Sequence, residues 1–202
     1  MTLSLFDPPW SDPPPGPHLV VFDLETQRSA AEVGGWDQAH RMGLSVAVCW
    51  DSRQDDFVVY HESQVEALVE HLRRAELVIG FNVLGFDYAV LRGYTPFDFW
   101  RLNTLDILYD VRLQLGHRIR LDALAQATLG VPKLADGLQA LTWWTEGRLD
   151  LLEDYCRQDV RVTRDLFRYG VDHGHLLYER RDGTPVPVPV EWNVAHLVAR
   201  QR

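Results

Sequence analysis

Two carboxylates, Asp23 and Glu25, lie one residue apart at the end of the apolar run "HLVVFDLET". Residues two apart in a strand point to the same face, so both side chains can reach one cation. A further carboxylate, Asp87, ends the stretch "NVLGFD". In "YCRQD", Tyr155 precedes Asp159 by four residues, which places both on one face of a helix. These segments therefore offer four carboxylates and a phenol to a shared site.

Four carboxylates in a confined site repel one another and raise each other's pKa values unless cations are bound. A ligand set made only of oxygen atoms favours Mg²⁺ or Mn²⁺ over zinc. Two such ions about 3.5–4 Å apart can activate water and stabilise the leaving oxygen of a phosphodiester. We therefore predict a two-metal site formed by Asp23, Glu25, Asp87 and Asp159, in which Tyr155 orients or helps to deprotonate the attacking water.

The elements that must position these residues follow from hydrophobic periodicity. Apolar runs predict strands at residues 18–24, 43–50, 56–60 and 76–82. The polar residues 51–55 predict a hairpin turn between the second strand and the third. Residues 104–111 are predicted to form a strand or a strand running into a helix. Helical spacing and Gly stops predict helices at residues 63–75, 85–93, 121–130, 135–147 and 149–170. Strands that alternate with helices in this way predict an α/β fold, a central mixed β-sheet flanked by α-helices.

The domain organisation follows from composition. Residues 1–17 contain six prolines and are predicted to form a flexible tail. Residues 18–202 are predicted to form one domain that ends in a β-hairpin, with its turn at Asp182-Gly183. No apolar run is long enough for a membrane span and no secretory signal is present, so we expect a cytoplasmic protein with no membrane partner. The net charge of −9 allows only a local basic surface for nucleic acid.

The three motifs, in this order and spacing, resemble those of the DEDD 3′–5′ exonucleases of ribonuclease H-like fold. The tyrosine at 155 matches the tyrosine subclass, because the histidine subclass carries His where this chain has Asp154. Over residues 20–169 the sequence also resembles predicted bacterial exonucleases related to the proofreading domain of family-B DNA polymerases. The resemblance implies that Asp23, Glu25 and Asp159 hold one ion, that Asp23 also touches the second, and that Asp87 binds through water.

The same resemblance implies where the substrate binds. Thr26, Asn82 and Phe86 would contact the terminal nucleotides, and Lys133 would contact a phosphate, although a solvated loop charge is an equal alternative for Lys133. The implied activity is hydrolysis at the 3′ end of single-stranded DNA in DNA repair or replication. A 3′–5′ exoribonuclease, an endonuclease and a catalytically silent nucleic-acid-binding scaffold remain alternatives, since spacing does not distinguish the sugars.

Several residues allow a purely structural interpretation. Asp87 could serve only as a first-turn carboxylate that interacts with the helix dipole, and Tyr155 as a half-buried aromatic on the inner helix face. Asp106 could support the site, but a solvated or hydrogen-bonded strand-end carboxylate is favoured. Arg118 and Arg120, and a stripe on the long helix, are candidates for the local basic surface; exposed arginines beside acidic neighbours are favoured for the stripe, Arg161, Arg164 and Arg168.

The N-terminal peptide "TLSLF" forms a separate hypothesis. It resembles the short peptide by which bacterial replication and repair proteins dock onto the sliding clamp, with Thr2 where glutamine is usual. Leu3, Leu5 and Phe6 would then be partner-binding residues, with Leu5 and Phe6 inserted into a pocket of the clamp. A plain disordered tail is the alternative.

Overall fold

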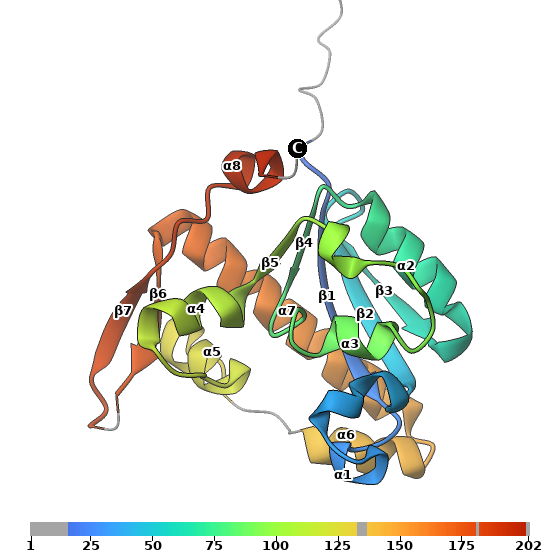
Figure 1. Ribbon diagram of the computed structural model, residues 1–202. Coiled ribbons are helices and arrows are strands. Elements are labelled where there is room, and N and C mark those ends of the chain that lie inside the picture. Colours follow the sequence, from blue (N-terminus) through green and yellow to red (C-terminus); the bar gives the residue numbers. More distant parts are fainter. Residues whose placement is uncertain (1–15, 133–136, 181, 201–202) are drawn as a thin grey trace, which may run out of the picture.

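The computed structural model describes residues 16–132, 137–180 and 182–200 (Figure 1). Its main sheet has five strands in the order β3-β2-β1-β4-β5. The bounds are β1 Leu19–Thr26, β2 Leu44–Asp51, β3 Asp56–His61, β4 Leu77–Gly80 and β5 Thr104–Asp106. The first three strands pair antiparallel, whereas β1 with β4 and β4 with β5 pair parallel. The predicted mixed sheet is confirmed.

Helices account for most of the remaining described chain. Their bounds are α1 Ala30–Val33, α2 Val65–Arg74, α3 Asp87–Leu91, α4 Ile107–Leu115, α5 Leu121–Leu129, α6 Gly137–Thr145, α7 Leu149–His173 and α8 Val194–Ala199. The segment 104–111 is a short strand that runs directly into α4, with Asp106 as the helix N-cap. Prediction from periodicity missed α1 and α8, which are short. For α1 the signal was readable, because Ser29 and Glu32 form a capping box.

Side chains of β1 alternate between two hydrophobic clusters, one on each face of the sheet. Val20, Phe22 and Leu24 lie in the cluster on the α2 and α3 side, whereas Val21 lies in the cluster that includes the buried residues of α7. Asp23 and Glu25 continue the phase of Val21 along the strand. Their side chains therefore project toward the face of the sheet that α7 covers.

Helix α7 is the longest element among the described residues and crosses that face of the sheet (Figure 1). Its buried residues recur at helical spacing, and the helix packs against β1, β2 and β4. The buried residues are Leu152, Cys156, Val160, Val162, Thr163, Leu166, Phe167 and Gly170. Asp159 lies beside this buried stripe, next to Val160. The packing of α7 therefore determines where Asp159 meets the strand carboxylates.

The C-terminal part of the described chain packs against α5 and α7. Strands β6 His175–Glu179 and β7 Pro185–Pro189 form an antiparallel two-stranded sheet. The turn between them includes Gly183 with φ of +81°, and the Asp182 side chain accepts a hydrogen bond from the Thr184 amide at 3.0 Å. No helix in the described part of the chain combines the length and the apolar character needed to cross a bilayer. The predicted tail lies almost wholly outside the described residues.

Candidate active site

The two strand carboxylates and the helix carboxylate converge. Oxygen atoms of Asp23, Glu25 and Asp159 all lie within 4.8 Å of one another, and the three side chains are only partly buried. The β1 ladder shifts register between Glu25 and Thr26, directly after the acidic pair. Such irregularities re-aim side chains and often occur beside functional sites. Three of the four predicted acidic residues thus form one cluster that is open to solvent on one side.

Asp87 joins this cluster from the other side of the strand end. It is the first residue of α3, its exposed fraction is 2%, and its Oδ1 accepts a hydrogen bond from the Leu24 amide at 3.1 Å. Leu24 lies between Asp23 and Glu25, so this bond fixes α3 against the acidic pair. The carboxylate of Asp87 also contributes to the raised pKa of Asp23. Asp87 is thus a first-turn carboxylate of α3 that also lies beside the acidic pair.

The loop before α3 is anchored by Asp106. Asn82 adopts a left-handed conformation, with φ of +69°, that non-glycine residues rarely occupy. The buried Asp106 carboxylate accepts hydrogen bonds from the amides of Asn82 at 2.8 Å, Leu84 at 3.0 Å and Tyr109 at 3.2 Å. Of the interpretations considered for Asp106, the hydrogen-bonded strand-end carboxylate is confirmed, and its partners show that it supports the Asn82 loop.

Tyr155 lies one turn before Asp159 on α7, and its hydroxyl interacts with the Asp159 carboxylate. Its ring meets that of Trp143 edge to face, with centroids 6.0 Å apart. The next residue, Cys156, is fully buried and its Sγ lies 3.7 Å from Asp23 Oδ2, close enough for a weak hydrogen bond. Tyr155 is half-buried, as expected for an aromatic residue on the inner helix face. Its hydroxyl nevertheless borders the acidic cluster.

Burial raises the pKa of every acid in the cluster, and neighbouring carboxylates raise these pKa values further. Loss of hydration is the largest cause for Asp23 and Glu25, and the neighbouring carboxylates raise both pKa values further. Burial raises the pKa of Asp159 to about 6 and, with the charge of Asp106, raises that of Asp87 to about 8. The same causes raise the pKa of the Tyr155 phenol, so it remains protonated at neutral pH.

The cluster fits divalent cations by the chemistry of its donors. Every ligand atom it offers is a carboxylate oxygen, the donor type that Mg²⁺ and Mn²⁺ prefer. No lysine or arginine forms a salt bridge with Asp23, Glu25, Asp87 or Asp159 in the described part of the chain. Bound cations would therefore relieve repulsion that the described protein groups leave uncompensated.

A cavity of about 370 Å³ adjoins the cluster. Its lining includes Asp23 and Asp159 together with Asn82, Arg118 and Arg120. Arg118 Nη2 donates a hydrogen bond to Asn82 Oδ1 at 2.9 Å, so an exposed cation is held at the mouth of the acidic site. This arrangement suits an anionic ligand that approaches the acids from the side of Arg118.

The arginine stripe on α7 has a different environment. Arg161 lies 5.4 Å above the ring of Phe57, and Arg168 lies 4.9 Å above the ring of Trp50. Arg164 pairs with Asp165 at 2.8 Å. The expected acidic neighbours are present for Arg164 and for Arg168, which lies 3.7 Å from Asp55, whereas Arg161 donates a hydrogen bond to Gln158. All three arginines pack on aromatic rings of β2 and β3, and Arg164 is largely buried there.

The remaining predicted substrate contacts have mixed outcomes. Thr26 is 9% exposed at the end of β1, and its hydroxyl donates to the Arg28 carbonyl at 3.0 Å. Phe86 is partly exposed immediately before α3 and meets Trp36 edge to face, with centroids 5.8 Å apart. Lys133, Leu3, Leu5 and Phe6 lie outside the described residues.

Prediction from sequence missed Trp36, whose side chain is 73% exposed and which adjoins Phe86. Its signal was an aromatic residue directly after two glycines in "GGWDQ", with no apolar periodicity to explain burial. The contact of Cys156 with Asp23 was also not predicted. Its approach to Asp23 depends on how α7 packs on β1, which no local pattern encodes.

Comparison with known proteins agrees with this geometry. A family model described as the RNase_H superfamily matches residues 20–170, and the chain belongs to that superfamily. No curated protein sequence matches the chain. Together, the family and the acidic cluster support a nuclease that uses divalent metal ions, and hence a nucleic acid substrate.

Among solved structures, the family B DNA polymerase from the hyperthermophilic archaeon Pyrobaculum calidifontis is similar to this chain, with a TM-score of 0.60 and 18% sequence identity. The match covers 80% of this chain and 25% of the polymerase chain, so it shows a shared fold within one part of a larger protein. The superfamily match and this likeness support the resemblance to DEDD-type exonucleases.

Proposed function

We propose that the protein is a metal-dependent 3′–5′ exonuclease of the tyrosine subclass that degrades single-stranded DNA. The observation that carries the proposal is the convergence of carboxylates from β1, α3 and α7 beside Tyr155. DNA is favoured over RNA because of the resemblance to proofreading domains and the likeness to a DNA polymerase structure. A role in DNA repair or replication follows from the same resemblance.

In this proposal, Asp23, Glu25 and Asp159 would hold one divalent ion, and Asp23 and, through water, Asp87 would hold the second. Two bound Mg²⁺ or Mn²⁺ ions would lower the pKa of an attacking water and stabilise the leaving oxygen. The protonated Tyr155 hydroxyl, held beside Asp159, would orient that water. Tyr155 thus acts by positioning a hydrogen bond and not as a preformed base.

The terminal nucleotides are proposed to lie over Asn82 and Phe86, with Thr26 at the end of β1 below them. The exposed Trp36 beside Phe86 extends this aromatic surface and could stack on a base. Arg118 would contact a phosphate at the mouth of the cavity. We keep Lys133 as a further proposed phosphate contact and Leu3, Leu5 and Phe6 as a proposed sliding-clamp peptide.

Degradation of end-labelled oligonucleotides with Mg²⁺ or Mn²⁺ tests the activity. A 5′-labelled single strand should give a ladder of shortening products, and a circular single strand should stay intact because it has no end. Asp23→Asn should abolish the ladder. Asp154→Asn should leave it unchanged, because that exposed carboxylate on α7 is a matched control outside the cluster.

Each alternative predicts a different outcome of the same assay. Faster loss of an RNA of identical sequence would favour the exoribonuclease. Cleavage of the circle would favour an endonuclease. If the wild-type protein binds the strand but shows no metal-dependent degradation, the exonuclease proposal is wrong and a silent scaffold is favoured.

A further inference from the structure

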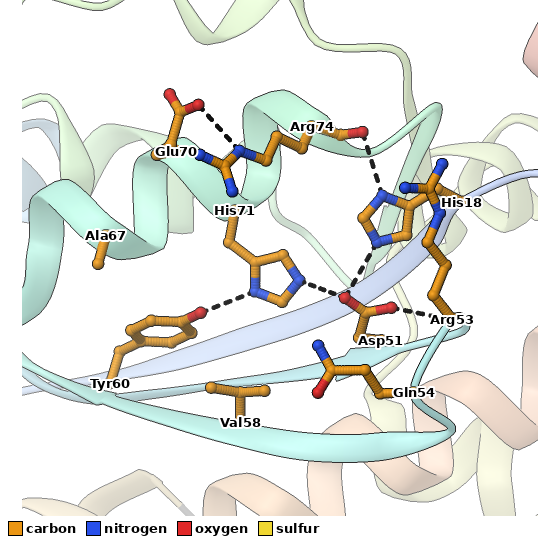
Figure 2. A pocket seen from close by; sticks show the side chains of 10 residues that line it. All are labelled: His18, Asp51, Arg53, Gln54, Val58, Tyr60, Ala67, Glu70, His71 and Arg74. Atoms are coloured by element: carbon orange, nitrogen blue, oxygen red, sulfur yellow. Dashed lines mark hydrogen bonds and ion pairs between the residues drawn. The ribbon is translucent and has the colours of Figure 1, made fainter.

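A second group of ligand-type side chains lies at the opposite end of β1. His18 immediately precedes β1, Asp51 ends β2 and His71 lies on α2; all three converge in Figure 2. Their side chains are nearly buried, with exposed fractions of 5%, 5% and 11%. The group is five residues from Asp23 along an extended strand, about 16 Å, so it is separate from the acidic cluster.

The three potential metal-ligand atoms point toward one another. His18 Nε2 lies 3.0 Å and His71 Nε2 lies 2.9 Å from the same oxygen, Asp51 Oδ2. All three atoms lie within 4.8 Å of one another. Ligand atoms bonded at about 2.0–2.1 Å to a tetrahedral centre stand about 3.3 Å apart, so two of the three separations are already close to those of a metal site.

The hydrogen-bond partners of His18 constrain where its protons lie. His18 Nδ1 faces the Arg74 carbonyl at 3.1 Å, and a carbonyl can only accept, so this nitrogen carries a proton. In a neutral imidazole the other nitrogen then presents a lone pair. That lone pair faces a carboxylate oxygen, which also only accepts. Either a second proton on His18 or a shared metal ion must lie between them.

The partners around the group match the support that metal ligands require. His18 is held by the Arg74 carbonyl, and His71 Nδ1 lies 2.8 Å from the Tyr60 hydroxyl. Asp51 Oδ1 accepts from the Arg53 amide at 2.8 Å. Metal-binding histidines generally bond through their second nitrogen in this way, which fixes the ring and the tautomer. Every ligand of the group is thus oriented by a separate contact.

We propose that His18, Asp51 and His71 bind a divalent transition metal ion of the zinc class. Two imidazole nitrogens and one carboxylate oxygen suit Zn²⁺, whereas Mg²⁺ prefers oxygen ligands alone. A cavity of about 590 Å³ adjoins the three side chains and gives the ion an entry path and an open coordination position. Glu70 also lines this cavity but bonds Arg74 at 3.0 Å, so it is not counted as a ligand.

The ion would join three parts of the fold. His18 and Asp51 are 33 residues apart and Asp51 and His71 are 20 residues apart, so a shared metal closes two long loops. Binding to the folded state alone stabilises it by mass action. The ion would therefore fix the start of β1 against β2 and α2, and Mg²⁺-dependent cleavage at the acidic cluster does not require it.

Metal binding should be measured in the full chain carrying Asp23→Asn and Asp159→Asn, which weakens the acidic cluster. Equilibrium dialysis against Zn²⁺ should retain one ion per chain. Co²⁺ should replace it and show the intense visible absorption of a four-coordinate nitrogen and oxygen site. His71→Phe and Asp51→Asn should each lower the affinity at least 100-fold. His196→Ala, which removes an exposed histidine elsewhere, should not change it.

Thermal unfolding gives a second readout. At a Zn²⁺ concentration 100 times the dissociation constant, Tm should rise by roughly 5–10 °C in the parent and not in His71→Phe. Failure to retain Zn²⁺, or retention that is equal in His71→Phe, in Asp51→Asn and in the parent, overturns the proposal. The group would then be a protonated His-Asp-His hydrogen-bond triad. Neither result depends on nuclease activity.

Discussion

At the scale of single residues, the carboxylates of the acidic cluster repel one another, and bound cations would relieve this repulsion. Burial and neighbouring charge raise the pKa of Asp159 to about 6 and of Asp87 to about 8, from an ordinary value of 3.8. Between pH 4 and pH 8 these two groups therefore bind more protons in the folded protein than in the unfolded chain. Stability from these two groups is complete below about pH 4 and is lost as pH rises through the raised values.

This imbalance predicts a pH dependence of the metal-free protein. In EDTA, Tm should fall as pH rises from 5 to 8, and Asp87→Asn should flatten the fall because its amide keeps the bond to Leu24 without the charge. At pH 8 the Tm of Asp87→Asn should exceed the Tm of the wild type by about 2–4 °C or more. Asp172→Asn, an exposed carboxylate on α7, should match the wild type. A Tm that climbs across this range in EDTA would contradict the account.

Tyr155 provides a test of positioning. Tyr155→Phe keeps the ring against Trp143 but removes the hydroxyl beside Asp159. We expect kcat to drop about 10²–10³-fold, the effect of losing one oriented hydrogen-bonding group, with little change in KM or Tm. Single-turnover cleavage of a labelled strand measures this. The control Tyr109→Phe changes a side chain that is 53% exposed, and equal kcat for the two variants would refute the assigned role.

At the scale of elements, the last residue of β5, Asp106, anchors the loop that carries Asn82. Asp106 caps α4 and binds two amides of that loop, so one buried carboxylate joins β5, α4 and the segment before α3. The left-handed backbone at Asn82 is held by these bonds. Asn82 in turn accepts the bond from Arg118 at the cavity mouth. The shape of the proposed substrate path thus depends on Asp106, for which no contact with the acidic pair or with the Tyr155 phenol is seen in the described part of the chain.

Removal of the Asp106 carboxylate should destabilise the protein. Asp106→Ala leaves three amides without their partner, and we expect a loss of about 2–4 kcal/mol in the free energy of unfolding. Urea denaturation measures it. Asp98→Ala removes an exposed cap of a short 3₁₀ helix and should cost less than about 1 kcal/mol. Comparable losses in both variants would show that Asp106 does not anchor the loop.

The sequence predicted most of the elements and the convergence of the acids because each motif lies within one element of clear periodicity. Asp23 and Glu25 share a strand phase with Val21, and Tyr155 and Asp159 share a helix face. The roles of Asp106, Cys156 and Trp36 were not predictable in the same way. Each depends on contacts between segments distant in sequence, which local periodicity does not encode.

At the scale of the whole molecule, the C-terminal segment belongs to the same packed body as the acidic site. Trp192 is 4% exposed, stacks near Phe167 and donates a hydrogen bond to Asp110 at 2.8 Å. It lies against Gly170 of α7, where an added Cβ would come within 2.3 Å of the indole ring. The chain after β7 therefore supports the helix that presents Asp159.

Gly170→Ala tests this contact. The new methyl group would force Trp192 or α7 to move, and we expect a loss of about 1–3 kcal/mol in the free energy of unfolding despite the better helix propensity of alanine. Gly137→Ala on α6 has open space and should be neutral or stabilising. Equal effects at the two positions would contradict the packing described for Trp192.

The most direct test of the central claim is a crystal structure with Mn²⁺ and a short single-stranded oligonucleotide, read by anomalous scattering. We predict two manganese peaks among Asp23, Glu25, Asp87 and Asp159, with the 3′ end of the strand beside them and its terminal bases at Phe86. The absence of manganese from this cluster, or a strand bound with its 5′ end at the acids, would contradict the account.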